Sequence, residues 1–256
     1  MYLKYVFFLI LLPLASLSQN FFNIKKNIIY IDANTSEDIV DLDLHNIRPF
    51  VYTKIPDLSG LTPSDKKNKF ISMILPSILI EKDKLKDIYS HVLNNMNIIE
   101  EDKDIQLLYD YCDCIDPNNL LLCLFENPTS VMLAQAAIES GWGTSRFFLE
   151  GFNLYGIHSF NIKDNRIQAN NTLDDSPVYV KKYPDVLSSI SDYLRTLGRV
   201  DSYAKYRETR MKSKNVIEML QYLSKYSERR ELYVKDISSI ISFNNLTQYD
   251  TLKIKW

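Results

Sequence analysis

Apolar residues recur every three or four positions over most of the chain after residue 61, which is the pattern of helices that bury one face. The first stretch starts at Thr62-Pro63-Ser64-Asp65 and continues to Leu93, with Pro76 inside, where a proline is expected to kink or split a helix. Two shorter helices are predicted at about 101–111 and 117–125. Further helical patterns cover Val186 to Leu197, Val216 to Leu223 and Tyr233 to Ile241.

Residues 131–138 form a stretch that is apolar on nearly every side. Asn127-Pro128-Thr129-Ser130 precedes it and is typical of a helix start, with a hydroxyl group available as N-cap. Gly141 and Gly143 follow it and are expected to end the helix. We therefore expect a buried helix whose last turn carries one charged residue, Glu139.

Glu139 has the surroundings of an acid catalyst. The carbonyl end of a helix dipole is negative, and desolvation by Trp142 or other neighbours adds to that effect, so both favour the protonated carboxyl group. A carboxylic acid that stays protonated near neutral pH can donate a proton to a glycosidic oxygen as the bond breaks. The alternative, from this segment alone, is an ordinary solvated glutamate at a helix end.

The helical pattern is lost between residues 152 and 183. Asn153-Leu154-Tyr155-Gly156-Ile157 and Pro177-Val178-Tyr179-Val180 have the composition of short strands, and the polar stretch from Asn161 to Asp175 separates them. A β-hairpin inserted between helices is predicted. The expected fold class is therefore mainly α (α+β), with a small β-hairpin lobe.

The first 18 residues have the pattern of an export signal. Lys4 provides a sparse positive start, Val6 to Ala15 an apolar core, and Ser16-Leu17-Ser18 a small-x-small cleavage site. An uncleaved N-terminal anchor is the alternative, although the apolar run is short for a membrane span. Residues 19–60 are polar and irregular and are expected to form an extended arm. The predicted location is the periplasm or cell envelope of a bacterium.

The composition excludes some classes of partner and cofactor. With 46% hydrophobic residues in 256 and a net charge of −2, the chain can bury a core but lacks the basic stripe of a nucleic-acid-binding protein. The three histidines are scattered without ligand spacing, so no metal or organic cofactor is expected. Cys112, Cys114 and Cys123 lie in one segment; either Cys123 pairs with one of the others, or all three are buried thiols.

Two motifs give the chain a resemblance to a known family. Ala134 to Ser145 reads Ala-Gln-Ala-Ala-Ile-Glu-Ser-Gly-Trp-Gly-Thr-Ser, and Asn-Leu-Tyr-Gly-Ile follows at Asn153. Together they resemble the glucosaminidase domain of glycoside hydrolase family 73, and within it the Bax-type bacterial proteins. Weaker agreement comes from Ile55 to Leu79, Ser188 to Leu197 and Tyr226 to Ile237.

The resemblance implies a lysozyme-like helical domain that hydrolyses β-1,4 bonds after N-acetylglucosamine in peptidoglycan, with Glu139 as general acid. The expected organisation is a signal peptide (1–18), an extended arm (19–60), an N-terminal helical region (61–127), a catalytic core (128–243) and a C-terminal tail (244–256). Peptidoglycan glycan strands are the expected partner.

The second catalytic group is less defined. The family often uses a carboxylate from the β-lobe, usually a glutamate, but this chain has no glutamate between Glu150 and Glu208. Asp164, Asp174 and Asp175 are the substitutes, although Asp174 and Asp175 also have ordinary turn composition. A substrate-assisted route, in which the acetamido oxygen of the sugar attacks the anomeric carbon, needs no such carboxylate.

The resemblance also implies roles for residues beside the acid. Tyr226 matches the family's Tyr-Ser motif and is expected to orient the acetamido group or a water molecule. Asn153 and Tyr155 are expected to line the cleft, as a hydrogen-bonding amide and a stacking ring. Gly156 is expected to permit a tight turn or close backbone approach, and Trp142 to serve mainly in packing.

The predicted function is thus that of an exported peptidoglycan hydrolase. The alternatives are a lytic transglycosylase, which also needs one helix-end glutamate, and a non-catalytic glycan-binding protein of the envelope.

Overall fold

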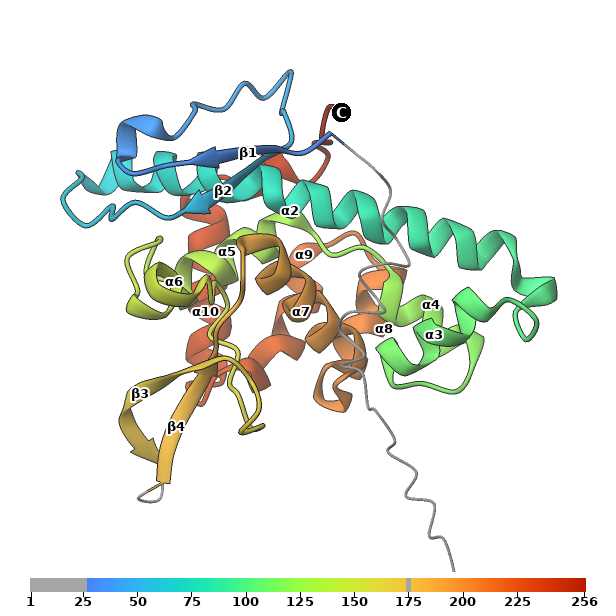
Figure 1. Cartoon of the computed structure of the whole chain (residues 1–256). Coiled ribbons are helices and arrows are strands. Elements are labelled where there is room, and N and C mark those ends of the chain that lie inside the picture. Colours follow the sequence, from blue (N-terminus) through green and yellow to red (C-terminus); the bar gives the residue numbers. More distant parts are fainter. Residues whose placement is uncertain (1–26, 174–175) are drawn as a thin grey trace, which may run out of the picture.

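A computed structural model describes residues 27–173 and 176–256. It is mainly helical with two small sheets, which confirms the predicted fold class. Figure 1 shows α2 (Pro63–Asn94) along one side of the helical body, while the β3–β4 ribbon projects from it. The other elements are β1 (Ile29–Asp32), η1 (Ser36–Asp38), β2 (Phe50–Lys54), η2 (Met96–Ile98), α3 (Lys103–Cys112), α4 (Pro117–Leu124), α5 (Thr129–Glu139), α6 (Arg146–Gly151), β3 (Arg166–Leu173), β4 (Ser176–Lys181), α7 (Val186–Arg199), η3 (Asp201–Tyr203), α8 (Ala204–Lys212), α9 (Val216–Leu220), η4 (Gln221–Tyr226), α10 (Glu231–Phe243) and η5 (Leu246–Tyr249).

Helix α2 is the longest element and is continuous through Pro76. Thr62 caps its start by accepting a hydrogen bond from the Asp65 backbone N–H, and Pro63 occupies the first turn. The expected split at Pro76 is wrong. Every residue from Phe70 to Lys82 is buried, and α2 packs against α4, α5, α7 and β2, so tertiary packing holds the helix together where a proline alone would break it.

Helix α5 lies at the centre of the core, because all its residues from Thr129 to Ala137 are buried. Its start differs from the predicted hydroxyl cap: Pro128 holds the N-cap position and makes no side-chain bond. Instead, the Asp250 carboxylate accepts hydrogen bonds from the Ser130 N–H at 2.7 Å and the Ser130 hydroxyl at 2.9 Å. A carboxylate at a helix N-terminus satisfies free N–H groups and complements the dipole.

The β-hairpin is present, but only one of its strands is where the pattern predicted it. Strand β4 covers the predicted Pro177–Val180 run, whereas its antiparallel partner is β3, inside the stretch expected to be a polar loop. Asn153–Ile157 forms a turn rather than a strand. Because this ribbon projects from the body, β3 needs no apolar face and gives no apolar signal.

The segment expected to be an extended arm contributes to the core within residues 27–60. Strands β1 and β2 pair in parallel, and Val51, Tyr52 and Leu58 are fully buried.

The predicted signal peptide (1–18) lies outside the described residues, and the division into domains stays a prediction. In the described part of the chain, no single helix is long and apolar enough to cross a membrane; α4 and α5, bent by 65°, pass that test only as a pair.

Cys112 and Cys123 form a disulfide that joins α3 to α4, which decides between the two cysteine arrangements left open by the sequence. Cys114 is a free, half-buried thiol. Beside the bridge, α7 approaches α4 closely at Gly198, where an added Cβ atom would lie 2.8 Å from the Cys123 sulfur and 3.2 Å from its carbonyl oxygen.

We predict that Gly198→Ala destabilises the protein by about 1–3 kcal/mol, because the methyl group overpacks this contact, despite the ~1 kcal/mol that alanine gains over glycine in a helix. Urea denaturation under oxidising conditions measures the loss. Gly60→Ala is the control, since nothing lies within 4 Å of a Cβ atom there. Equal stability of the two variants would contradict the close contact.

Candidate active site

Glu139 is the last residue of α5, and its carboxyl group is largely buried. Burial raises its pKa from 4.5 to about 7, while a hydrogen bond from Tyr233 acts in the opposite direction. The group is therefore substantially protonated at neutral pH. Desolvation, one of the two causes expected from the sequence, accounts for this shift.

The turn after Glu139 explains the Gly-Trp-Gly sequence. Gly141, Trp142 and Gly143 all have positive φ values, of 58°, 56° and 84°, a conformation that favours glycine. Trp142 tolerates it while its ring packs edge-on against Phe70 at 5.6 Å between centroids. The Ser140 hydroxyl donates to the Ala136 carbonyl and accepts from the Gly143 N–H, so this turn is fixed to α5.

A chain of hydrogen bonds through the core ends on Glu139. The Tyr193 hydroxyl donates to Gln135 Oε1 (2.7 Å), Gln135 Nε2 donates to the Tyr233 hydroxyl (3.0 Å), and that hydroxyl donates to Glu139 Oε1 (2.7 Å). Because Oε1 is held as an acceptor, the acid proton belongs on Oε2.

Oε2 of Glu139 faces the backbone of Gly156. A Cβ atom at Gly156 would lie 3.1 Å from Oε2, and the residue has φ 67°. Both the space and the backbone conformation therefore favour glycine, and the chain passes directly over the acid.

The structure contradicts the cleft-lining positions expected for Asn153 and Tyr155. Asn153 is 1% exposed, and its amide bonds to both backbone groups of Ile157 and to the Lys181 carbonyl. Tyr155 is fully buried and stacks on Tyr193 at 3.7 Å between ring centroids. Both side chains hold the Asn-Leu-Tyr-Gly turn in place, and what reaches the acid is the backbone of that turn.

Tyr226 lies beside the acid and is partly exposed. Its ring stacks on Tyr233 at 5.8 Å, and its hydroxyl donates to the Tyr155 carbonyl at 2.9 Å. Burial, together with the neighbouring Tyr233 and Glu139, raises its pKa well above 10, so the phenol stays neutral. Since its one proton is committed to Tyr155, its oxygen is left as an acceptor.

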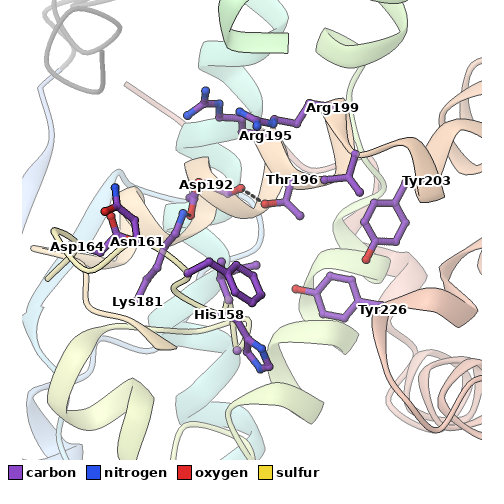
Figure 2. A pocket seen from close by; sticks show the side chains of 14 residues that line it. His158, Asn161, Asp164, Lys181, Asp192, Arg195, Thr196, Arg199, Tyr203 and Tyr226 are labelled. Atoms are coloured by element: carbon purple, nitrogen blue, oxygen red, sulfur yellow. Dashed lines mark hydrogen bonds and ion pairs between the residues drawn. The ribbon is translucent and has the colours of Figure 1, made fainter. Parts of the chain in front are cut away.

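A pocket of about 600 Å³ runs from Gly156 and Tyr226 to the start of the hairpin (Figure 2). Figure 2 shows Tyr203 and Tyr226 at one end, with the Tyr203 hydroxyl group turned toward Tyr226, and Asn161 and Asp164 at the other. Glu139 does not line this pocket itself; it lies behind Gly156. The remaining lining residues are Ile157, His158, Phe160, Lys181, Asp192, Arg195, Thr196, Arg199 and Val200.

Two carboxylates line the pocket, and both are engaged. Asp164 accepts a hydrogen bond from the Ser159 hydroxyl at 2.8 Å, and Asp192 accepts from Lys181 and Tyr183, each at 2.7 Å. The other two candidates, Asp174 and Asp175, lie outside the described residues. Within the described ranges, no group of three or more His, Cys, Asp or Glu side chains is placed to hold a metal ion.

Gln135 and Tyr233 were not singled out as site residues from the sequence. A signal existed for Gln135, because a glutamine four residues before Glu139 lies on the same face of an otherwise apolar helix. Tyr233 belongs to a motif that resembles the family, but its spacing alone is equally typical of helix packing.

Part of the chain is similar in sequence to known proteins. Residues 125–246 match the model of the glucosaminidase family, described as mannosyl-glycoprotein endo-beta-N-acetylglucosaminidase. The protein bax of Escherichia coli (strain K12) is 28% identical over 115 residues, which are 41% of this chain and 39% of that protein. The match thus spans about two fifths of the curated relative.

Among solved structures, the catalytic domain of the autolysin Auto from Listeria monocytogenes aligns at 27% identity and a TM-score of 0.42, over 56% of this chain and 87% of that one. A peptidoglycan hydrolase from Sphingomonas sp. A1 aligns at 24% identity and a TM-score of 0.39, over 48% and 79%.

The residues that match the family model include Glu139, Gly156, Tyr226 and Tyr233. The match over residues 125–246 is consistent with a Bax-type glucosaminidase-like domain and supports a glycoside hydrolase.

Proposed function

We propose that the chain is an exported peptidoglycan hydrolase that cleaves the β-1,4 bond after N-acetylglucosamine, with Glu139 as the general acid. The observation that carries the proposal is the state of this carboxyl group: its pKa is raised to about 7, Oε1 is fixed by Tyr233, and Oε2 is directed at the backbone of Gly156. Export and an envelope location are proposed from the pattern of residues 1–18.

In the proposed reaction, Glu139 transfers the proton on Oε2 to the glycosidic oxygen as the bond to the anomeric carbon breaks. The chain of Tyr193, Gln135 and Tyr233 supports this step, because it keeps Oε1 as an acceptor and stabilises the carboxylate that remains. After the leaving sugar departs, the same carboxylate is placed to take a proton from water.

The acetamido group of the substrate is the proposed second participant. The Tyr226 oxygen can accept its N–H, which would turn the acetamido oxygen toward the anomeric carbon. This route is favoured because Asp164 and Asp192 are both held by other donors. A carboxylate from Asp174 or Asp175 remains the alternative.

The variants Asp174→Asn and Asp175→Asn distinguish the two routes. A tenfold or larger loss of turnover in either variant, about 1.4 kcal/mol in barrier, would favour the carboxylate.

We predict that Glu139→Gln abolishes clearing of purified cell wall in a zymogram, because the amide cannot donate an acidic proton. The role of Glu139 as general acid would be contradicted if the variant cleared the cell wall as well as the wild type does, or if neither protein cleared it. Products of the wild-type digest should carry new reducing ends on N-acetylglucosamine in mass spectrometry. Anhydromuramic ends would instead identify a lytic transglycosylase.

The same variant provides its own folding control. Because folding raises the pKa of Glu139, the wild type loses part of its stability as pH rises from 4.5 through about 7 and the buried carboxyl group ionises. Glutamine does not ionise, so the variant keeps this part of its stability. Thermal unfolding should give equal Tm values for both proteins below pH 4.5 and a higher Tm for Glu139→Gln at pH 8. A lower Tm at both pH values would mean that inactivity comes from misfolding.

We further predict that hydrolysis falls as pH rises above about 7, when Glu139 loses its proton. In Tyr233→Phe this alkaline limb should move to higher pH, because the hydrogen bond that lowers the Glu139 pKa is gone, while the maximal rate falls as the carboxyl group loses its orientation. The pH profile of kcat measures both effects.

Tyr206→Phe is the matched control for this profile, because it also removes a buried tyrosine hydrogen bond, the one to Asn127, away from the acid. An alkaline limb that moves equally in both variants, or in neither, would contradict the role of Tyr233.

A further inference from the structure

One edge of the pocket carries two arginines whose charge the proposed cleavage does not use. Arg195 and Arg199 are one turn apart on α7, and both line the pocket, as Figure 2 shows. The pocket also contains Lys181, and its carboxylates are Asp164 and Asp192. Without the arginines these charged lining groups sum to −1, and with them to +1.

The pairing inside the pocket leaves these two guanidinium groups without a carboxylate. Asp192 is bound by Lys181 at 2.7 Å, and Asp164 by the Ser159 hydroxyl. Arg195 donates only its Nε hydrogen, to the Tyr111 carbonyl at 3.1 Å, and Arg199 has no hydrogen-bond or ion-pair partner in the described part of the chain. Partly buried arginines without a counter-ion favour an anionic ligand.

Arg195 is also held in position before any ligand arrives. Its guanidinium group lies 5.2 Å from the centre of the Tyr111 ring, and the Nε contact fixes its rotation. Its two terminal nitrogens therefore remain as parallel donors, the geometry that binds a carboxylate through both oxygens. Pre-ordering reduces the entropy cost of binding.

The position of this pair relative to the acid indicates which carboxylate it would meet. The pocket extends from Gly156, where a Cβ atom would lie 3.1 Å from Glu139 Oε2, to Arg195 and Arg199 on α7. A glycan strand whose scissile oxygen lies at Glu139 would therefore place the substituents of a neighbouring sugar along this wall. In peptidoglycan, muramic acid carries a lactyl group. Its carboxyl group is free where no peptide is attached; elsewhere it forms the amide bond to a stem peptide, which has carboxyl groups of its own.

We propose that Arg195 and Arg199 form a carboxylate-binding subsite that takes an anionic substituent of muramic acid, so that the domain selects peptidoglycan over uncharged glycans of N-acetylglucosamine. The proposal rests on the proposed function for its choice of ligand. It extends that function by naming residues that determine the substrate, outside the group that carries out bond cleavage.

The test is a binding measurement by calorimetry with the full chain carrying Glu139→Gln, so that no glycan is cleaved. Three probes separate the sources of charge: an N-acetylglucosamine tetrasaccharide without carboxylates, peptide-free peptidoglycan fragments with lactyl carboxylates only, and the same fragments with stem peptides. We expect the charged probes to bind more tightly than the uncharged one. A preference that appears already with the peptide-free fragments identifies the lactyl group, and one that needs peptides identifies the stem.

Adding Arg199→Gln to this protein should weaken binding of the charged probes about tenfold, the worth of a charge-assisted hydrogen bond, and leave the uncharged tetrasaccharide unaffected. Arg195→Gln should act in the same way. Because Arg195 also packs on Tyr111, Arg195→Lys, which keeps the charge but not the paired donors, checks that the loss is not one of folding. Arg48→Gln is the control for net charge, since Arg48 is exposed and does not line the pocket.

Equal weakening of all three probes, or of none, would overturn the subsite, as would a parent protein without preference for charged glycans. Added salt should reduce the preference in the parent but not in the double variant Arg195→Gln/Arg199→Gln. Binding is measured without turnover, so the two proposals fail separately. If the protein with Glu139 intact hydrolyses no cell wall while the arginine-dependent preference persists, the proposed function is wrong and the subsite stands.

Discussion

The burial of α5 on all sides is the constraint on which the rest of this structure depends. A helix that is apolar around its whole circumference has to be enclosed by other elements, and α2, α10 and η5 supply that enclosure. Any polar group on such a helix must find its partners inside the protein. Gln135 does so between Tyr193 and Tyr233, and Glu139 does so with Tyr233. The acidity of Glu139 is thus a consequence of how the core is closed.

The surroundings of the Glu139 carboxyl group are formed by backbone as well as by side chains. Two tight turns, at residues 141–143 and at Gly156, leave little room for a side chain: a Cβ atom at Gly143 would lie 3.0 Å from the Phe70 ring, and one at Gly156 would lie 3.1 Å from Glu139 Oε2. The aromatic side chains around them lie mostly behind the turns and fix their position. The Asn-Leu-Tyr-Gly sequence thus shapes the surroundings of the acid although its asparagine and tyrosine side chains are buried.

Helix positions and the acid could be predicted from the sequence because both depend on local periodicity. The stretch before Glu139 is apolar whichever way the helix is turned, so the glutamate is conspicuous. Strand β3 was missed because a ribbon that projects from the body needs no apolar face. The buried position of Tyr155 was missed because a short turn has no periodicity that assigns its side chains to a face. The contact between Asp250 and Ser130 could not be predicted from the sequence, because 120 residues separate the two and local patterns carry no information on such pairs.

That last contact has a consequence for how the domain acquires its structure. The carboxylate bound at the N-terminus of α5 comes from Asp250, which is synthesised long after the helix itself. Long-range contacts of this kind slow folding, because the ends of a large loop must meet before the contact can form. Until residue 250 is synthesised, the helix that carries the acid lacks these bonds, so its capped form is a late product of chain elongation.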